Sequence, residues 1–161
     1  MFSADLRARA EKLLADARAQ GLRIALAESC TGGLIAGLLT EIAGSSEVLD
    51  RGFVTYSNQA KEEMLGVPAA LLKQHGAVSQ AVARAMAEGA IRKSSAQLSV
   101  AVTGIAGPGG GTAEKPVGLV HIAAARGDRI IHRECRFGDI GRGEVRLKSA
   151  ETALQMLSQL L

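Results

Sequence analysis

Apolar residues recur along the chain with two different spacings, and the spacing in each segment predicts a helix or a strand. Apolar positions three or four residues apart, bounded by capping residues or glycines, predict helices at residues 3–20, 31–42, 58–65, 68–76, 79–93 and 143–160. Short apolar or alternating runs predict strands at residues 22–27, 51–56, 97–103, 117–125 and 129–137. Residues 104–111 are so rich in glycine that they predict a loop.

The order of these elements predicts an α/β fold. Strands separated by helical segments indicate a sheet covered by helices, and the two strands flanking residues 126–128 indicate an antiparallel hairpin. We therefore expect an α/β sandwich with a mixed sheet of about five strands. The length of 161 residues fits one domain, and no repeat, linker or low-complexity tract divides residues 1–161.

Composition and charge narrow the possible partners. Hydrophobic residues make up 47% of the chain and charged residues 22%, which is typical of a globular protein. No apolar run approaches the roughly 20 residues of a membrane-spanning helix, so we expect a cytoplasmic protein with no membrane partner. The net charge of +3 is spread along the chain and only four side chains are aromatic, so we expect no nucleic-acid partner. A small anionic ligand remains compatible with this balance.

Two junctions between a predicted strand and the segment after it are the candidate sites, at residues 27–33 and 103–111. In open α/β sheets, ligands bind at the carboxyl ends of strands, where helix N-termini expose free amides. Ser29 is either an ordinary N-cap or a nucleophile. If it is a nucleophile, the backbone amides of residues 30–33 would bind the oxyanion that develops on the substrate. Gly32 and Gly33 are costly in a first helical turn, so they favour close approach by a ligand or close helix packing.

A serine nucleophile needs a base, and no histidine fits this role. His75, His121 and His132 show no partner spacing, and no Gly-x-Ser-x-Gly elbow surrounds Ser29. The sequence therefore does not predict a Ser-His-Asp triad.

Lys61 is the alternative base, one turn into the helix that follows the strand at residues 51–56. Burial beside other donors or cations would lower the pKa of its ammonium toward neutrality. The competing interpretation is a solvated lysine that pairs with Glu62 or Glu63. Tyr56 either lends its phenol to a proton relay or simply packs.

Other residues suggest less specific chemistry. Cys30 is a rival nucleophile, because a thiol near a helix N-terminus can have a lowered pKa. The loop at residues 104–111 lacks the P-loop ending but has a backbone suited to a phosphate or a ribose. Arg142 and Arg146 share one helical face and would either hold a phosphate or remain solvated. No cluster of possible ligands has metal-binding spacing, so we expect no metal.

Three blocks, in this order, resemble the signature segments of the CinA C-terminal domain family. They are AESCTGG at residues 27–33, GFVTYSN at residues 52–58 with Lys61, and TGIAGPGGGT at residues 103–112. EKPVG follows at residues 114–118, and the resemblance covers nearly the whole chain. Family members commonly have Gly-Asp-Arg after the residue that matches Phe137, whereas Ile140 and Gly141 separate Asp139 from Arg142 here. From the resemblance, Arg146 is therefore the safer phosphate candidate of the two arginines.

The resemblance implies a three-layer α/β/α sandwich with a mixed, mostly parallel five-stranded sheet. Active family members hydrolyse the carboxamide of nicotinamide mononucleotide to nicotinic acid mononucleotide and ammonia, without a metal or other cofactor. The resemblance makes Ser29 the nucleophile, Lys61 the base and Tyr56 its helper. The expected substrate-binding residues are Cys30, Thr31, Gly32, Gly33, Asn58, Thr103, Gly104, Gly107, Gly109, Arg142 and Arg146.

Two further classes of function remain open from the sequence. The chain is either this amidohydrolase, with a small nucleotide as its partner, or a non-catalytic nucleotide-binding or protein-interaction module linked to competence or DNA damage. An amidase for a different pyridine or sugar nucleotide is a third interpretation. Relatives are often dimeric, so we expect a homodimer or higher homo-oligomer. The C-terminal leucines at positions 154, 157, 160 and 161 would either cover the sheet or contact a second subunit.

Overall fold

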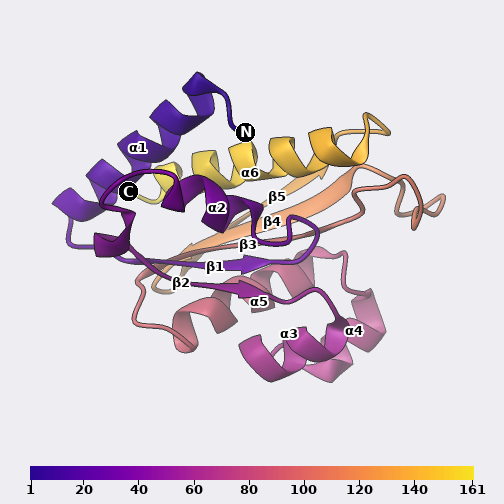
Figure 1. Cartoon of the computed structure of the whole chain (residues 1–161). Coiled ribbons are helices and arrows are strands. Elements are labelled where there is room, and N and C mark those ends of the chain that lie inside the picture. The colour runs from indigo at the N-terminus through magenta and orange to yellow at the C-terminus, as the bar shows by residue number, and fades with distance from the viewer.

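A five-stranded sheet in the order β2-β1-β3-β4-β5 forms the centre of the computed structural model, which describes residues 1–161 (Figure 1). The strands are β1 (Ile24–Glu28), β2 (Leu49–Val54), β3 (Leu98–Gly104), β4 (Leu119–Arg126) and β5 (Arg129–Arg136). β1 pairs in parallel with β2 and β3, whereas β4 pairs antiparallel with β3 and β5. Four strands thus share one direction and β4 opposes them, which confirms the expected mixed, mostly parallel sheet.

Helices cover both faces of the sheet and complete three layers (Figure 1). α1 (Ala4–Ala19), α2 (Leu34–Thr40) and α6 (Arg142–Gln159) lie on one face. α3 (Asn58–Leu65), α4 (Ala69–His75) and α5 (Gln80–Arg92) lie on the other, and a short 3₁₀ turn spans Ser45–Glu47. The expected α/β/α sandwich is therefore confirmed.

The two faces of the sheet differ in the size of their side chains. In β1, Ile24 and Leu26 belong to the core beneath α1 and α6, whereas Ala25 and Ala27 belong to the core beneath α5. Small residues allow the α5 backbone to approach the sheet, and the Ser99 hydroxyl of β3 donates to the Ala87 carbonyl of α5 at 2.7 Å. The period of two expected for strands therefore sorts bulky and small residues to opposite layers.

One helix begins later than the sequence pattern predicts. α2 begins at Leu34 rather than at residue 31, and residues 30–33 form a turn. Gly32 has φ +57° and Gly33 has φ +98°, conformations that strain a residue with a side chain. The two glycines therefore shape the turn between β1 and α2 and do not lie in a helix. β2 also ends earlier than predicted, at Val54, so Tyr56 lies beyond the strand.

The C-terminal leucines cover the sheet, which was one of their two predicted roles. Leu154, Leu157 and Leu160 are buried in the core between α1, α6 and the sheet, and Leu161 packs against it. None of the helices combines the length and apolarity needed to cross a lipid bilayer.

Candidate active site

Three segments that are far apart in the sequence meet at one edge of the sheet. Because β1, β2 and β3 run in parallel, the residues that follow them lie at the same carboxyl edge. A cavity of about 290 Å³ opens there. Ten of the predicted site residues line it: Ser29, Cys30, Tyr56, Asn58, Lys61, Thr103, Gly104, Gly107, Gly109 and Arg142.

Ser29 and Lys61 are in direct contact within this cavity. The Lys61 Nζ lies 3.1 Å from the Ser29 Oγ and donates to the Thr55 carbonyl at 2.9 Å. Lys61 is only 1% exposed, and Ser29 is 8% exposed. The interpretation of Lys61 as a solvated lysine paired with Glu62 or Glu63 is therefore wrong.

Local structure explains how Lys61 reaches Ser29. The Ser57 hydroxyl accepts from the Ala60 amide at 3.0 Å and begins α3 directly beyond the end of β2. Lys61 follows one turn later, and its side chain is buried against Ser29 and the Thr55 carbonyl. The predicted helix bounds of residues 58–65 are confirmed.

Burial changes the acid–base chemistry of Lys61. Desolvation lowers the pKa of its ammonium from the ordinary value of 10.5, because a buried charge is disfavoured, and the nearby Cys30 thiol opposes this shift weakly. A lowered pKa increases the fraction of neutral amine near neutral pH. The geometry and the direction of this shift are those required of a base that removes the Ser29 proton.

Glu28 holds the segment after Ser29, which we call the nucleophile loop (residues 29–33). Its side chain is 1% exposed, and its carboxylate accepts from the Ile35 and Ala36 amides at 2.9 and 3.0 Å. An anionic side chain at the first turn of a helix is electrostatically favourable. Sequence reasoning missed this role, although an acidic residue at the end of a buried apolar strand is a signal for it.

Arg146 of α6 holds the same loop from another element. Its Nε donates to the Cys30 carbonyl at 3.2 Å, and its Nη2 donates to the Thr31 carbonyl at 2.9 Å. Arg146 does not line the cavity, and neither do Thr31, Gly32 and Gly33. These four predicted binding residues are therefore not on the cavity wall.

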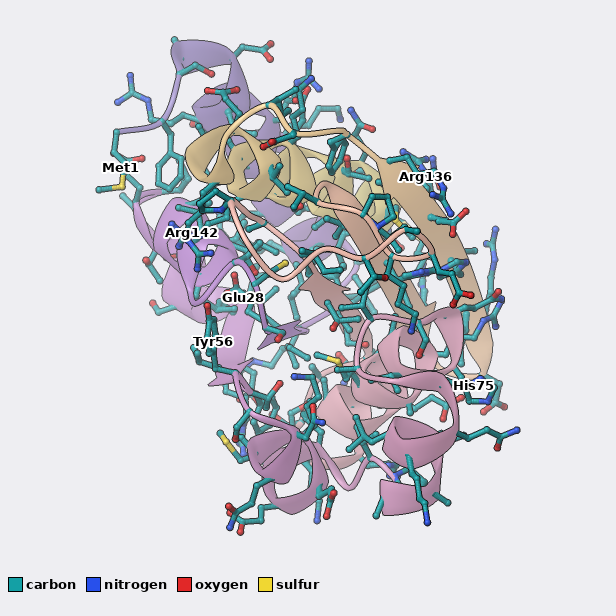
Figure 2. The ribbon with its side chains drawn as sticks, turned by 90° about the vertical axis from the view of Figure 1, so that its right-hand side faces the viewer. Met1, Glu28, Tyr56, His75, Arg136 and Arg142 are labelled. Carbon is teal, nitrogen blue, oxygen red and sulfur yellow. The ribbon has the colours of Figure 1, made fainter.

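Tyr56 and Arg142 meet at the cavity and point toward one another (Figure 2). The Arg142 guanidinium donates to the Tyr56 hydroxyl at 2.9 Å and to the Gly107 carbonyl at 2.8 Å. Tyr56 is 60% exposed, and its backbone carbonyl lies 3.5 Å from the Lys61 Nζ. Its phenol thus bonds Arg142, which ties the end of β2 to α6.

The remaining wall of the cavity is small and largely apolar. The Thr103 hydroxyl donates to the Ala77 carbonyl at 2.9 Å and links β3 to the segment before α5. Ala77 and Val78 also line the cavity and carried no chemical signal in the sequence, whereas Ile105, Ala106 and Gly110 belong to the predicted glycine-rich loop. Arg142 is cationic and no lining residue is acidic, so the cavity favours an anionic ligand.

The rival nucleophile Cys30 lines the cavity, but its thiol is not activated. Burial raises the pKa of Cys30 to about 11, and its backbone amide and Arg146 only partly offset this effect. A thiol with a raised pKa is a poor nucleophile near neutral pH because the thiolate is the reactive form.

The histidines lie outside the cavity. His121 Nδ1 and His132 Nε2 are 2.9 Å apart on β4 and β5, a pairing that the sequence pattern did not reveal. Burial lowers the pKa of both rings. Neither they nor His75 contact Ser29, in agreement with the sequence analysis.

The fold and the site together define a three-layer α/β/α protein with a buried serine–lysine pair at the carboxyl edge of its sheet. Residues 6–161 match the family model described as the CinA C-terminal domain. The chain therefore belongs to the CinA family, as the three sequence blocks predicted.

Individual relatives extend this comparison. The chain is 51% identical to nicotinamide-nucleotide amidohydrolase PncC of Escherichia coli K12 over 88% of this chain and 86% of that protein. It is 58% identical to a CinA-like protein of Anaeromyxobacter dehalogenans over 86% of this chain, but it spans about a third of the length of such relatives. The crystal structure of the competence/damage inducible protein CihA from Agrobacterium tumefaciens has a TM-score of 0.97 at 58% identity and covers 99% of this chain and 98% of that one.

Proposed function

We propose that this protein is an amidohydrolase that converts nicotinamide mononucleotide to nicotinic acid mononucleotide and ammonia, with Ser29 as nucleophile and Lys61 as base. One observation carries the proposal: a buried lysine amine lies 3.1 Å from a serine hydroxyl at the wall of a cavity. The similarity to a protein named nicotinamide-nucleotide amidohydrolase supports the substrate.

The reaction proceeds in two halves. Ser29 Oγ attacks the carboxamide carbon while its proton passes to the neutral Lys61 amine. The tetrahedral intermediate then expels ammonia, which takes the proton from Lys61 and leaves an acyl-serine. Water attacks the acyl-serine, Lys61 receives the water proton, and Ser29 regains a proton as the carboxylate product departs. Backbone amides of the nucleophile loop stabilise the oxyanion in both halves.

Arg142 is the candidate contact for the nucleotide phosphate. It lines the cavity, and its present acceptors, the Tyr56 phenol and the Gly107 carbonyl, are both uncharged. A phosphate would replace them with stronger, charge-assisted hydrogen bonds. Binding energy from the phosphate, far from the reacting carbon, would orient the carboxamide at Ser29.

The direct test is to incubate the purified protein with nicotinamide mononucleotide from pH 6 to 9 and to measure ammonia and the nicotinic acid product. We expect turnover with the nucleotide and much slower turnover with nicotinamide, which lacks the ribose phosphate. Binding of the nucleotide without ammonia release would instead indicate a non-catalytic nucleotide-binding module.

Two variants distinguish the candidate nucleophiles in the same assay. Ser29→Ala should lower kcat by about 10⁴-fold or more, because the acyl intermediate cannot form. Cys30→Ala should retain most of the activity, since the thiol is buried and its pKa is raised. The opposite pattern would identify a thiol enzyme.

A further inference from the structure

Two charged side chains from different elements hold the nucleophile loop without lining the cavity. Glu28 binds two amides at the start of α2, and Arg146 binds two successive carbonyls, those of Cys30 and Thr31. Both carbonyls belong to the residues directly after Ser29. The carbonyls of the loop that presents Ser29 are therefore anchored by a guanidinium, and the helix that directly follows the loop is anchored by a carboxylate.

Anchoring a carbonyl also sets the direction of an amide. Because a trans peptide is planar, its C=O and the following N–H point in opposite directions. The Cys30 carbonyl points to Arg146, so the Thr31 amide points away from Arg146. The Gly32 amide donates to the Ser29 carbonyl at 3.0 Å, whereas no carbonyl or carboxylate oxygen accepts from the Cys30 or Thr31 amides. Of these two residues, Cys30 lines the cavity beside Ser29, whereas Thr31 does not.

The same contacts argue against a substrate role for Arg146. A guanidinium donates in a fixed planar fork, and the Nε and Nη2 of Arg146 are both engaged by backbone oxygens. Arg142, one turn earlier on α6, lines the cavity and bonds neutral groups at its wall. The two arginines share a helix face but have different environments.

We propose that Arg146 is a positioning residue: by holding the Cys30 and Thr31 carbonyls it fixes the loop that presents Ser29 at the cavity wall, while Glu28 fixes the start of α2 directly after that loop. This inference rests on the proposed acyl-transfer function and assigns the phosphate to Arg142 alone. Replacing Arg146 should therefore lower kcat without lowering the affinity for the substrate.

The test measures the reactivity of Ser29 both with and without the amide substrate. Diisopropyl fluorophosphate reports reactivity alone: Ser29 Oγ bonds to phosphorus, fluoride leaves, and the hydroxyl proton passes to Lys61. Mass spectrometry follows the labelling rate, with Ser29→Ala as the blank, and kcat and KM for nicotinamide mononucleotide are measured in parallel. The variants are Arg146→Lys, Arg146→Ala with and without added guanidinium, and Glu28→Gln.

We expect Arg146→Lys to lower both kcat and the labelling rate by about 100-fold, because misplacing a reacting group by about 1 Å has an effect of that size. KM should change less than about twofold. Guanidinium should restore part of the activity of Arg146→Ala, which a merely unfolded variant would not show. Lys148→Gln is the matched control for Arg146→Ala, since it also removes one positive charge from α6 but at an exposed position, and it should leave both rates unchanged.

Two results would overturn this assignment. If Arg146→Lys raises KM tenfold or more and leaves the labelling rate unchanged, Arg146 is a phosphate contact. If it leaves both kcat and the labelling rate unchanged, Arg146 has no role in the reaction. Failure of the proposed substrate has a different signature. In that case, wild-type protein would label at Ser29 and release no ammonia, and slower labelling of Arg146→Lys would still support the positioning role.

Discussion

The two sides of the cavity differ in exposure and in how firmly they are held. On the reacting side, formed by Lys61 and the nucleophile loop, Lys61 is 1% exposed, and Glu28 and Arg146 supply four hydrogen bonds to loop and helix backbone. On the open side, formed by Tyr56, Arg142 and the loop at residues 104–111, Tyr56 is 60% exposed. Rigid placement suits the atoms that react, whereas an exposed side suits the entry and release of a nucleotide.

The largest expected effect is on the reacting side, at Lys61. Lys61→Met should lower kcat by about 10³-fold or more, since no other group lies at hydrogen-bond distance to take the Ser29 proton. Lys61→Arg should not restore activity, because a guanidinium does not release its proton near neutral pH. Ammonia release measures both rates, and circular dichroism checks the fold. Near-normal turnover of Lys61→Met would remove the proposed base.

The lowered pKa of Lys61 also predicts how stability depends on pH. Below the ordinary value of 10.5, the unfolded lysine holds its proton while the buried one releases it at a lower pH. The unfolded state then binds more protons, so this residue makes the fold more stable as pH rises toward 10.5. Lys61→Met removes the cost of burying a charge, so it should be more stable than wild type where the lysine is protonated. In denaturant titrations, the difference in the free energy of unfolding between Lys61→Met and wild type should therefore shrink with rising pH. An advantage that grows with pH would contradict the buried, neutral amine.

A smaller effect is expected at Gly33 on the reacting side. Gly33→Ala should destabilise the protein by about 1–2 kcal/mol, because φ at Gly33 is +98°. Gly37→Ala is the matched control four residues later, in α2, where an added Cβ would meet nothing within 4 Å. It should stabilise the protein by about 0.5–1 kcal/mol. Thermal unfolding measures both, and equal shifts of the same sign would mean that the loop is not held in this turn.

The smallest effect is expected on the open side, at Lys115. Its ammonium donates to the His75 carbonyl and ties the segment after the glycine-rich loop to α4. Lys115→Met should raise KM about two- to tenfold with little change in kcat, since one partly exposed hydrogen bond contributes about 0.5–1.5 kcal/mol. Steady-state kinetics with nicotinamide mononucleotide provide the measurement. A fall in kcat comparable to that of Arg146→Lys would erase the distinction between the two sides.

Much of the fold was predictable because its signals are local. Caps at Ser3, Ser57 and Ser79 and the glycine after His75 marked helix ends that the structure reproduces within one residue. The start of α2 was not predictable from spacing, because the apolar pattern extends into a turn that Gly32 and Gly33 form with positive φ.

The candidate site was predictable where a residue's chemistry requires a particular partner. A serine at a strand end and a lysine one turn into a helix could be paired from the sequence because both lie at the same sheet edge. The roles of Glu28 and Arg146 could not, since each binds backbone groups that the sequence does not distinguish. The burial of Lys61 likewise depends on how α3 packs against α5, which is a tertiary property.

The dependence of the reacting centre on α6 has a consequence for synthesis of the chain. Arg142 and Arg146 lie in the first two turns of the last helix, so their contacts form only after the ribosome has released that segment. A nascent chain that already carries Ser29 and Lys61 still lacks the guanidinium that fixes the peptides beside them. Competence for chemistry should therefore emerge only once α6 has been made and has packed on the sheet, and not gradually.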